Sequence, residues 1–229
     1  MSATPSLKSV SSCTGVGLPP ASALPTASST GVPLPPPSEG LSVYHVAIGR
    51  GIQNYTCPST TNMTATPKAL GAVATLYNVS CQAAISTSSL STLPDLVAMT
   101  PKDQMGKTLF AATPDAQMSG HHYFTDNTTP TFNLNVDDEK SLGVIFSKKV
   151  SQVPAPSGSG QSIDGSKAVP WLYLKTSDSP AGDDPTGNFG GVKEVYRVNT
   201  AGGAAPPTCE GLMGQSFSKE YSAEYWFFA

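Results

Sequence analysis

Short runs of β-branched and aromatic residues, separated by clusters of glycine, proline, aspartate and serine, fill most of this chain after residue 41. Such runs are typical of β-strands joined by turns. We expect strands at 43–48, 51–57, 72–78, 108–112, 121–125, 130–135, 142–146, 169–175, 192–199 and 222–228. About 190 residues of short strands predict an all-β fold, a single β-sandwich or barrel-like domain.

The same pattern predicts the turns, loops and helix between the strands. Gly49-Arg50-Gly51 is expected to be a turn between the first two strands, and long loops are expected at 154–166 and 177–191. No stretch keeps a helical period well. The segment 82–93, which ends before Pro94, is expected to form one short helix.

Residues 1–41 differ in composition from the rest of the chain. They contain eight prolines and only two charged residues. Such a segment cannot bury enough apolar surface to offset the entropy lost on ordering, so it favours extended polyproline or coil. We predict two parts: a Pro/Ser-rich extended arm at 1–41 that wraps on the domain, and a β-domain at 42–229.

Four cysteines lie far apart in the sequence without a Cys-X-X-Cys motif: Cys13, Cys57, Cys81 and Cys209. An even number without metal-ligand spacing predicts two disulfides rather than a zinc ribbon or a thioredoxin-like redox site. Four cysteines allow three pairings. We favour Cys57–Cys81, between adjacent strand ends, and Cys13–Cys209, which would attach the arm to the domain.

Four Asn-X-Ser/Thr sequons begin at Asn54, Asn62, Asn78 and Asn127. N-glycans and structural disulfides both belong to the secretory route. Charged residues make up 13% of the chain, against about 25% in average soluble domains. We therefore expect a secreted, extracellular glycoprotein in its mature form, in which Met1 replaces the signal peptide.

A glycan on Asn54 has a consequence for its neighbours. Because side chains alternate along a strand, Gln53, Tyr55 and Cys57 would then point inward. A buried glutamine needs hydrogen-bond partners. Gln53 therefore belongs to an internal polar network, or Asn54 carries no glycan.

Charge and hydropathy exclude two kinds of partner. The formal net charge is −3 and the chain has no basic block, so we expect no nucleic-acid partner. No uncharged apolar run approaches the roughly 18 residues that a membrane span needs. We therefore expect no membrane insertion.

One ordered series of segments carries a family resemblance. The segments are Gly51–Cys57, Gly120–Phe124, Pro130–Phe132, Ala168–Leu172, Arg197–Gly203, Pro206–Cys209 and Tyr221–Phe228. The series resembles a family of secreted fungal and bacterial proteins catalogued as domain of unknown function 3455, from about residue 43 to the C-terminus. The resemblance implies a fungal-type secreted protein and implies no activity.

Some members of that family carry a malate dehydrogenase label, which these residues do not support. A dinucleotide fold needs Gly-X-Gly-X-X-Gly between a strand and a helix. Gly49-Arg50-Gly51 reaches Asn54 where the third glycine belongs, and Gly158-Ser159-Gly160 reaches Ile163. Neither segment can bind a pyrophosphate, so we expect no cofactor.

Aromatic residues are the main candidates for ligand binding. Trp171 and Tyr173 share one face of their expected strand, as do Tyr225 and Phe227 on the last strand. An exposed aromatic row can stack on sugar rings, whereas a buried one forms core. Arg197 is a further candidate, with either a structural role or a contact to an anion or another ligand.

Catalytic signatures are weak in this sequence. No Gly-X-Ser-X-Gly nucleophile elbow occurs, and no spacing pairs two carboxylates for glycoside hydrolysis. A metal site would use His45 and one of the adjacent His121 and His122, of which we name His122. The carboxylate would come from Asp126 or from 137–139; the alternative is that the histidines are structural.

Two functional hypotheses follow. We prefer a non-catalytic extracellular or cell-surface protein whose partner is cell-wall polysaccharide or an extracellular protein. The alternative is a secreted enzyme that acts on polysaccharide or depends on a metal, using His45, His122 and nearby carboxylates. Burial of Trp171, Tyr173, Tyr225 and Trp226 would exclude sugar stacking on these residues. Histidines that do not meet near a carboxylate would exclude the metal site.

Overall fold

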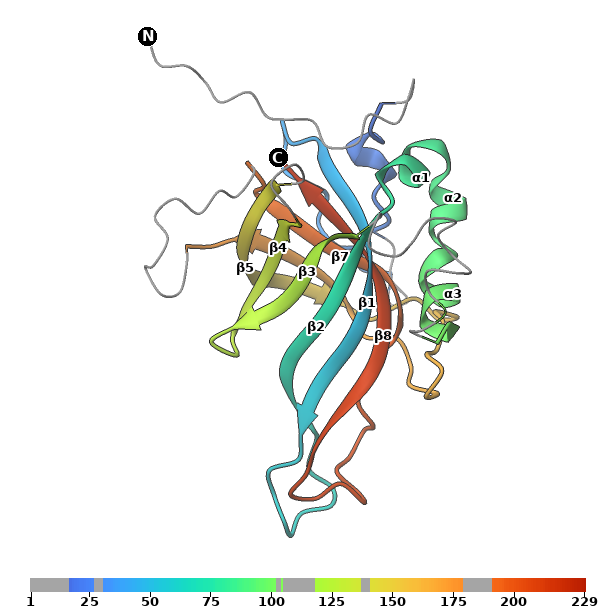
Figure 1. Cartoon of the computed structure of the whole chain (residues 1–229). Helices are drawn as coiled ribbons and strands as arrows, with labels where there is room; N and C mark the ends of the chain where they lie inside the picture. The colour runs from blue at the N-terminus through green and yellow to red at the C-terminus, as the bar shows by residue number, and fades with distance from the viewer. Residues whose placement is uncertain (1–16, 27–30, 102–103, 105–117, 137–140, 179–190) are drawn as a thin grey trace.

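The computed structural model describes residues 17–26, 31–101, 104, 118–136, 141–178 and 191–229. Within them, eight antiparallel strands form a closed barrel in chain order, and the last strand pairs with the first (Figure 1). The strands are β1 (Val43–Thr56), β2 (Lys68–Asn78), β3 (Met118–Thr125), β4 (Thr129–Asn135), β5 (Ser141–Val153), β6 (Trp171–Thr176), β7 (Glu194–Gly202) and β8 (Ser216–Phe228). The predicted all-β, barrel-like fold is therefore confirmed, and closure leaves no unpaired sheet edge.

β1 is one continuous strand, and the turn predicted at Gly49–Gly51 is wrong. Gly49 pairs with Leu76 of β2 on one side and with Ala223 of β8 on the other. A Cβ atom on Gly49 would lie 2.5 Å from Cε2 of Tyr225. This glycine is present because a large side chain approaches the strand closely, not because the chain turns.

Most other strand predictions overlap β2 to β8, which extend beyond the expected bounds at several ends. The strand predicted at 108–112 lies outside the described residues. The loop predicted at 154–166 connects β5 to β6, and most of the loop predicted at 177–191 lies outside the described residues.

Three short helices connect β2 to β3 and pack on the outside of the barrel (Figure 1): α1 (Ser80–Ile85), α2 (Thr87–Leu90) and α3 (Leu93–Met99). The single helix predicted at 82–93 is therefore wrong. Pro94 lies in the first turn of α3, where its missing N–H would have no intrahelical acceptor. α3 contacts β7 and β8. No helix in the described ranges is long and apolar enough to cross a membrane.

Alternation along the strands produces two apolar clusters, one on each side of the barrel wall. The inner cluster includes Leu76, Phe132, Ile145, Val195 and Tyr225. The outer cluster lies between the wall and the segments that cover it, and includes Leu24, Leu34, Ala83, Val97, Trp171, Tyr173, Tyr196, Trp226 and Phe228.

The described part of the N-terminal segment packs on the outer wall. Leu24 and Leu34 are buried there, and a short 3₁₀ helix, η1 (Ala21–Ala23), precedes Leu24. Ser38 donates two hydrogen bonds to the Glu194 carboxylate, from its amide at 3.1 Å and from its hydroxyl at 2.6 Å. The division into an arm at 1–41 and a β-domain at 42–229 stays a prediction.

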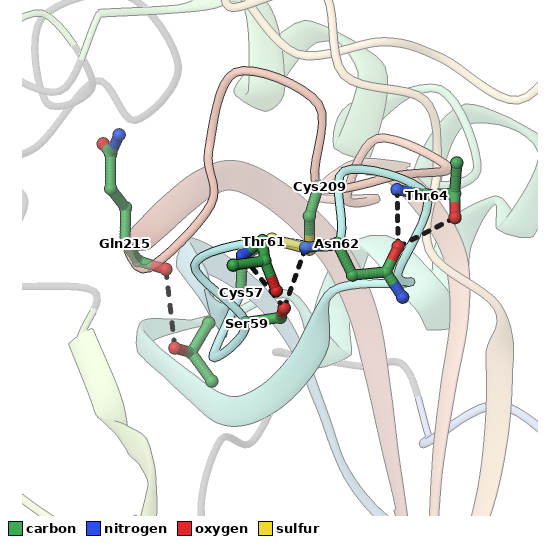
Figure 2. Close-up of a disulfide and its surroundings, with 8 residues drawn as sticks. Cys57, Ser59, Thr61, Asn62, Thr64, Cys209 and Gln215 are labelled. Atoms are coloured by element: carbon green, nitrogen blue, oxygen red, sulfur yellow. Dashed lines mark hydrogen bonds between the residues drawn. A yellow bond between two sulfur atoms is a disulfide. The ribbon is translucent and has the colours of Figure 1, made fainter.

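Cys57 is bonded to Cys209, so the favoured pairings Cys57–Cys81 and Cys13–Cys209 are wrong (Figure 2). β2 runs back along β1 until Asn78 lies opposite Ala47, ten residues before Cys57. At about 3.3 Å per residue, Cys81 is therefore some 30 Å from Cys57. The β8 end lies next to Cys57 instead, where the Cys57 amide donates to the Gln215 carbonyl at 2.8 Å. Cys81 is also disulfide-bonded, and Cys13 lies outside the described residues.

Candidate functional site

A cavity of about 380 Å³ is lined by residues of the β3–β4 turn and of the neighbouring strands. Figure 1 shows the end of the barrel at which this turn lies. We call this cavity the mouth cavity. Its apolar wall is formed by the side chains of Phe124, Pro130, Val169, Leu172 and Leu174. Eight-stranded barrels have an interior large enough for either packed side chains or one small ligand. Among the described residues, part of the interior is occupied by the inner cluster and part remains as the mouth cavity.

Polar side chains reach the mouth cavity from β1 and β7. Gln53 and Tyr55 line it, which confirms the inward direction that strand alternation predicts for them. Arg197 of β7 also lines it; this residue pairs with Leu172 of β6 on one side and with Tyr225 of β8 on the other. The strand register therefore places one arginine beside the apolar wall.

Arg197 is buried, with 7% of its surface exposed. Its Nη2 donates to the Pro170 carbonyl at 2.9 Å, while its Nε has no hydrogen-bond partner among the described residues. None of the described residues that line the mouth cavity is Asp or Glu. The guanidinium therefore lies in the cavity wall without a carboxylate beside it there.

Gln53 is the second buried polar group whose donors are not all used. Its side chain is 8% exposed, and Nε2 has no hydrogen-bond partner in the described part of the chain. Buried polar atoms are nearly always paired in folded proteins, with protein groups or with water or ligand. Among the described residues the polar network around Gln53 is therefore incomplete, and the alternative that Asn54 carries no glycan stays open.

Three tyrosines near Arg197 are uncharged. The Tyr55 hydroxyl donates to the Gly203 carbonyl at 2.8 Å, and the hydroxyls of Tyr221 and Tyr225 lie 2.8 Å apart. Burial raises the pKa of all three, and the positive charge of Arg197 only partly opposes this effect. No tyrosinate therefore neutralises Arg197 at neutral pH.

The two candidate metal ligands, His45 and His122, are both buried, and their ring nitrogens lie within hydrogen-bonding distance of other described residues. His45 is fully buried near the far end of the barrel, where its ring nitrogens lie 3.0 Å from the Ser119 hydroxyl and 3.2 Å from the Ser80 hydroxyl. In His122, Nδ1 donates to the Thr131 carbonyl at 2.9 Å, and the ring stacks on Phe132. Burial lowers the pKa of each histidine to about 4, so both are neutral at physiological pH.

The predicted metal site does not form from the residues that the structure describes. They contain no cluster of three or more His, Cys, Asp or Glu side chains that could hold a metal ion. Asp126 lies in the β3–β4 turn, where its carboxylate accepts hydrogen bonds from Thr128 and Thr129. The acidic run at 137–139 lies outside the described residues.

The aromatic row predicted for sugar stacking is wrong, because its members are buried. Trp171 is 3% exposed, Tyr173 5%, Tyr225 1% and Trp226 0%. Tyr225 belongs to the inner cluster, and the other three belong to the outer cluster beneath the helices and the N-terminal segment. Of the predicted ligand contacts, Arg197 alone lines the mouth cavity.

Lysines at the rim of the mouth cavity were missed by the sequence reasoning. Lys148 and Lys149 of β5 line the cavity together with Gln152. Strand alternation could have placed one of two adjacent lysines inward, but no local signal indicates that β5 reaches this end of a closed barrel. Phe124 and Leu172 were missed for the same reason.

The four sequons differ in exposure. Asn62 and Asn127 are exposed in loops, whereas Asn54 and Asn78 are half-buried in strands. The Asn62 Oδ1 accepts from the amide and the hydroxyl of Thr64, at 3.0 and 2.8 Å, beside the disulfide (Figure 2). Occupancy of the four sites stays a prediction.

Comparison with known proteins gives one match. A family model described as "Protein of unknown function (DUF3455)" matches residues 37–229, which include the entire barrel and every residue that lines the mouth cavity. The chain belongs to this family. The resemblance carried by the seven sequence segments is therefore confirmed. No curated protein and no solved structure matches the chain. Membership in DUF3455 adds no activity to the geometry described above.

Proposed function

We propose that this DUF3455 protein is a secreted, non-catalytic extracellular or cell-surface protein that holds a small ligand in its mouth cavity. The observation that carries the proposal is a cavity of about 380 Å³ whose apolar wall surrounds buried polar groups with unused donors. Small-molecule sites have this composition, with a few placed polar groups in an apolar lining, and volumes of about 300–1,000 Å³.

Secretion is supported by two features. Disulfides such as Cys57–Cys209 form and persist mainly in oxidising compartments, and two of the four sequons are exposed in loops. Expression with a secretion leader in a eukaryotic host tests this part. We expect the protein in the medium, with a mass that N-glycosidase reduces. Retention inside the cell, or a mass that N-glycosidase does not change, would contradict it.

Binding is tested with the neutral fluorescent probe N-phenyl-1-naphthylamine and the full-length secreted protein. We expect saturable binding with an increase in fluorescence. Ala69→Trp should block it, because Ala69 is exposed and lines the mouth cavity, so the indole would occupy the opening without disturbing the core. Leu70→Trp is the matched control, since Leu70 is the next residue, is also exposed and does not line the cavity. Equal binding by both variants, or no saturable binding by the parent protein, would overturn the proposal.

A further inference from the structure

We infer that the ligand of the mouth cavity is a small carboxylate with an apolar aromatic or aliphatic body. This inference rests on the proposed function and specifies the chemical class of its ligand. It follows from the charge of the cavity, from the hydrogen-bonding groups that remain unused in it, and from the shape of its apolar wall.

The charge of the cavity has one sign. Arg197, Lys148 and Lys149 line it, and none of its described lining residues is acidic. A buried charge is costly unless an opposite charge or hydrogen bonds compensate it. The neutral His122 and the protonated tyrosines next to Arg197 supply no negative charge. An anionic ligand supplies the missing one.

The unused hydrogen-bonding groups are donors. Arg197 Nε and Gln53 Nε2 are both buried, and neither has an acceptor among the described residues. The Tyr55 hydroxyl already donates to the Gly203 carbonyl, so its oxygen is available only as an acceptor. Arg197 Nη2 already donates to the Pro170 carbonyl, so the unused donor of the guanidinium is Nε–H. A carboxylate oxygen matches it, because it accepts hydrogen bonds and donates none.

Apolar side chains define the rest of the ligand. Phe124, Leu172 and Leu174 line the same cavity as Arg197, and Leu172 is the direct cross-strand neighbour of the arginine. A ligand whose carboxylate contacts Arg197 therefore has its body against this wall. A simple inorganic anion would leave the apolar wall in contact with water, and a neutral apolar molecule would leave the guanidinium without a counter-charge.

The test compares 1-naphthoate with 1-naphthamide, two ligands of the same ring and nearly the same shape that differ in charge. Each displaces N-phenyl-1-naphthylamine from the full-length protein. We expect the carboxylate to bind at least about tenfold more tightly than the amide, the effect of a charge-assisted hydrogen-bonded contact. Arg197→Met keeps an unbranched apolar stem and removes the charge and the donors, so it should abolish this preference.

A control pair separates Arg197 from the lysines at the rim. Lys148→Gln and Lys149→Gln should reduce the preference for the carboxylate only slightly, and the residual effect should fall with added salt because these side chains lie at the opening. A preference that survives in Arg197→Met but disappears in the lysine variants would overturn the assignment to Arg197. Gln53→Met should lower the affinity for 1-naphthoate, but 1-naphthoate should still bind more tightly than 1-naphthamide.

The binding measurements distinguish failure of this inference from failure of the proposed function. Equal affinity for 1-naphthoate and 1-naphthamide, with both blocked by Ala69→Trp, would contradict the carboxylate and leave the binding function intact. Binding of neither ligand nor of the neutral probe would contradict both proposals.

Discussion

Two carboxylates on the outer wall of the barrel show how the surroundings of a single residue set its charge. Glu194 accepts hydrogen bonds from Ser38, Tyr173 and Tyr196. Burial raises its pKa, but the hydrogen bonds from Ser38 and Tyr173 and the charge of Lys175 outweigh this effect and lower it. Glu224 accepts from Asn199 Nδ2 at 2.7 Å and from Trp226 Nε1 at 2.8 Å. Its burial outweighs these two bonds and raises its pKa to about 7.

The raised pKa of Glu224 predicts a loss of stability as the pH rises. A carboxyl group whose pKa is higher in the folded state stabilises the fold fully below its unfolded pKa of 4.5, and this stabilisation is lost as the pH passes about 7. Between pH 5.5 and 8, Glu224 should account for a loss of about 2 kcal/mol in the free energy of unfolding. Urea unfolding at both pH values should show this loss in the parent protein and a smaller one in Glu224→Gln.

Comparing the two proteins isolates Glu224. The lowered pKa of His45 and of His122 makes stability rise with pH from about 4 to 6.5, and this effect cancels in the difference. The lowered pKa of Glu194 places its own effect below pH 4.5. The same pH dependence in both proteins would contradict the raised pKa.

Two buried arginines should respond in opposite ways to the same substitution. Arg197 lies beside the mouth cavity without a carboxylate there, whereas Arg50 forms an ion pair with the Glu220 carboxylate. Without ligand, Arg197→Met should leave the free energy of unfolding unchanged or raise it, because an uncompensated buried charge disappears. Arg50→Met should lower it by about 1–3 kcal/mol, since Glu220 is only partly exposed. Denaturant unfolding of both variants tests this, and a larger loss in Arg197→Met than in Arg50→Met would show that Arg197 has a compensating partner.

At the scale of single elements, two predictions from local residue type were wrong because glycine and proline occur in more than one structural context. Gly49-Arg50-Gly51 has the composition of a turn, yet β1 continues through it because Gly49 makes room for Tyr225. Pro94 has the signature of a helix end, yet it occupies the first turn of α3. For Gly49 the correct interpretation depends on Tyr225, which is distant in sequence and which a single sequence does not reveal. For Pro94 the residue is compatible with the first turn of a helix as well as with a helix end.

Strand β1 offers a direct test of this explanation. Gly49→Ala should destabilise the protein by about 1–3 kcal/mol, because the added Cβ meets a tightly packed ring. Gly17→Ala is the matched control, since a Cβ there meets no atom within 4 Å. Thermal unfolding measures both. If the clash is with Tyr225, Gly49→Ala should cost less stability in the Tyr225→Leu background than it does in the parent protein. A neutral effect of Gly49→Ala would contradict the close approach.

For the whole molecule, the sequence predicts the class of fold and the direction of some side chains, but not barrel closure. Alternation along β1 predicts that the side chains of Gln53 and Tyr55 point into the barrel, and this needs only local information. The burial of Trp171, Tyr173 and Trp226 depends on segments that cover the outer wall, and the mouth cavity depends on β8 pairing with β1. The charge of Arg197 can be read from the sequence, whereas its position opposite Leu172 and in the same cavity as Phe124 depends on how the strands pair.

The disulfide joins the two strands that close the barrel. Cys57 follows β1 and Cys209 precedes β8, and their sequence separation is 152. Cross-linking so long a loop reduces the entropy of the unfolded chain, an effect of about 2–5 kcal/mol. The double variant Cys57→Ala/Cys209→Ala should lose this much free energy of unfolding in urea. Unchanged stability would contradict the role of the disulfide in barrel closure.

The central claim, that the mouth cavity binds a small carboxylate through Arg197, is tested most directly by two-dimensional ¹H–¹⁵N NMR of the full-length protein titrated with 1-naphthoate. We expect the Arg197 Nε–H and Gln53 Nε2 resonances to shift in a saturable way, together with backbone amides near Phe124 and Leu172. Equivalent titration with 1-naphthamide should shift the amides near the apolar wall and leave the Arg197 Nε–H little changed. Saturable shifts confined to other parts of the molecule, or none at all, would contradict the account.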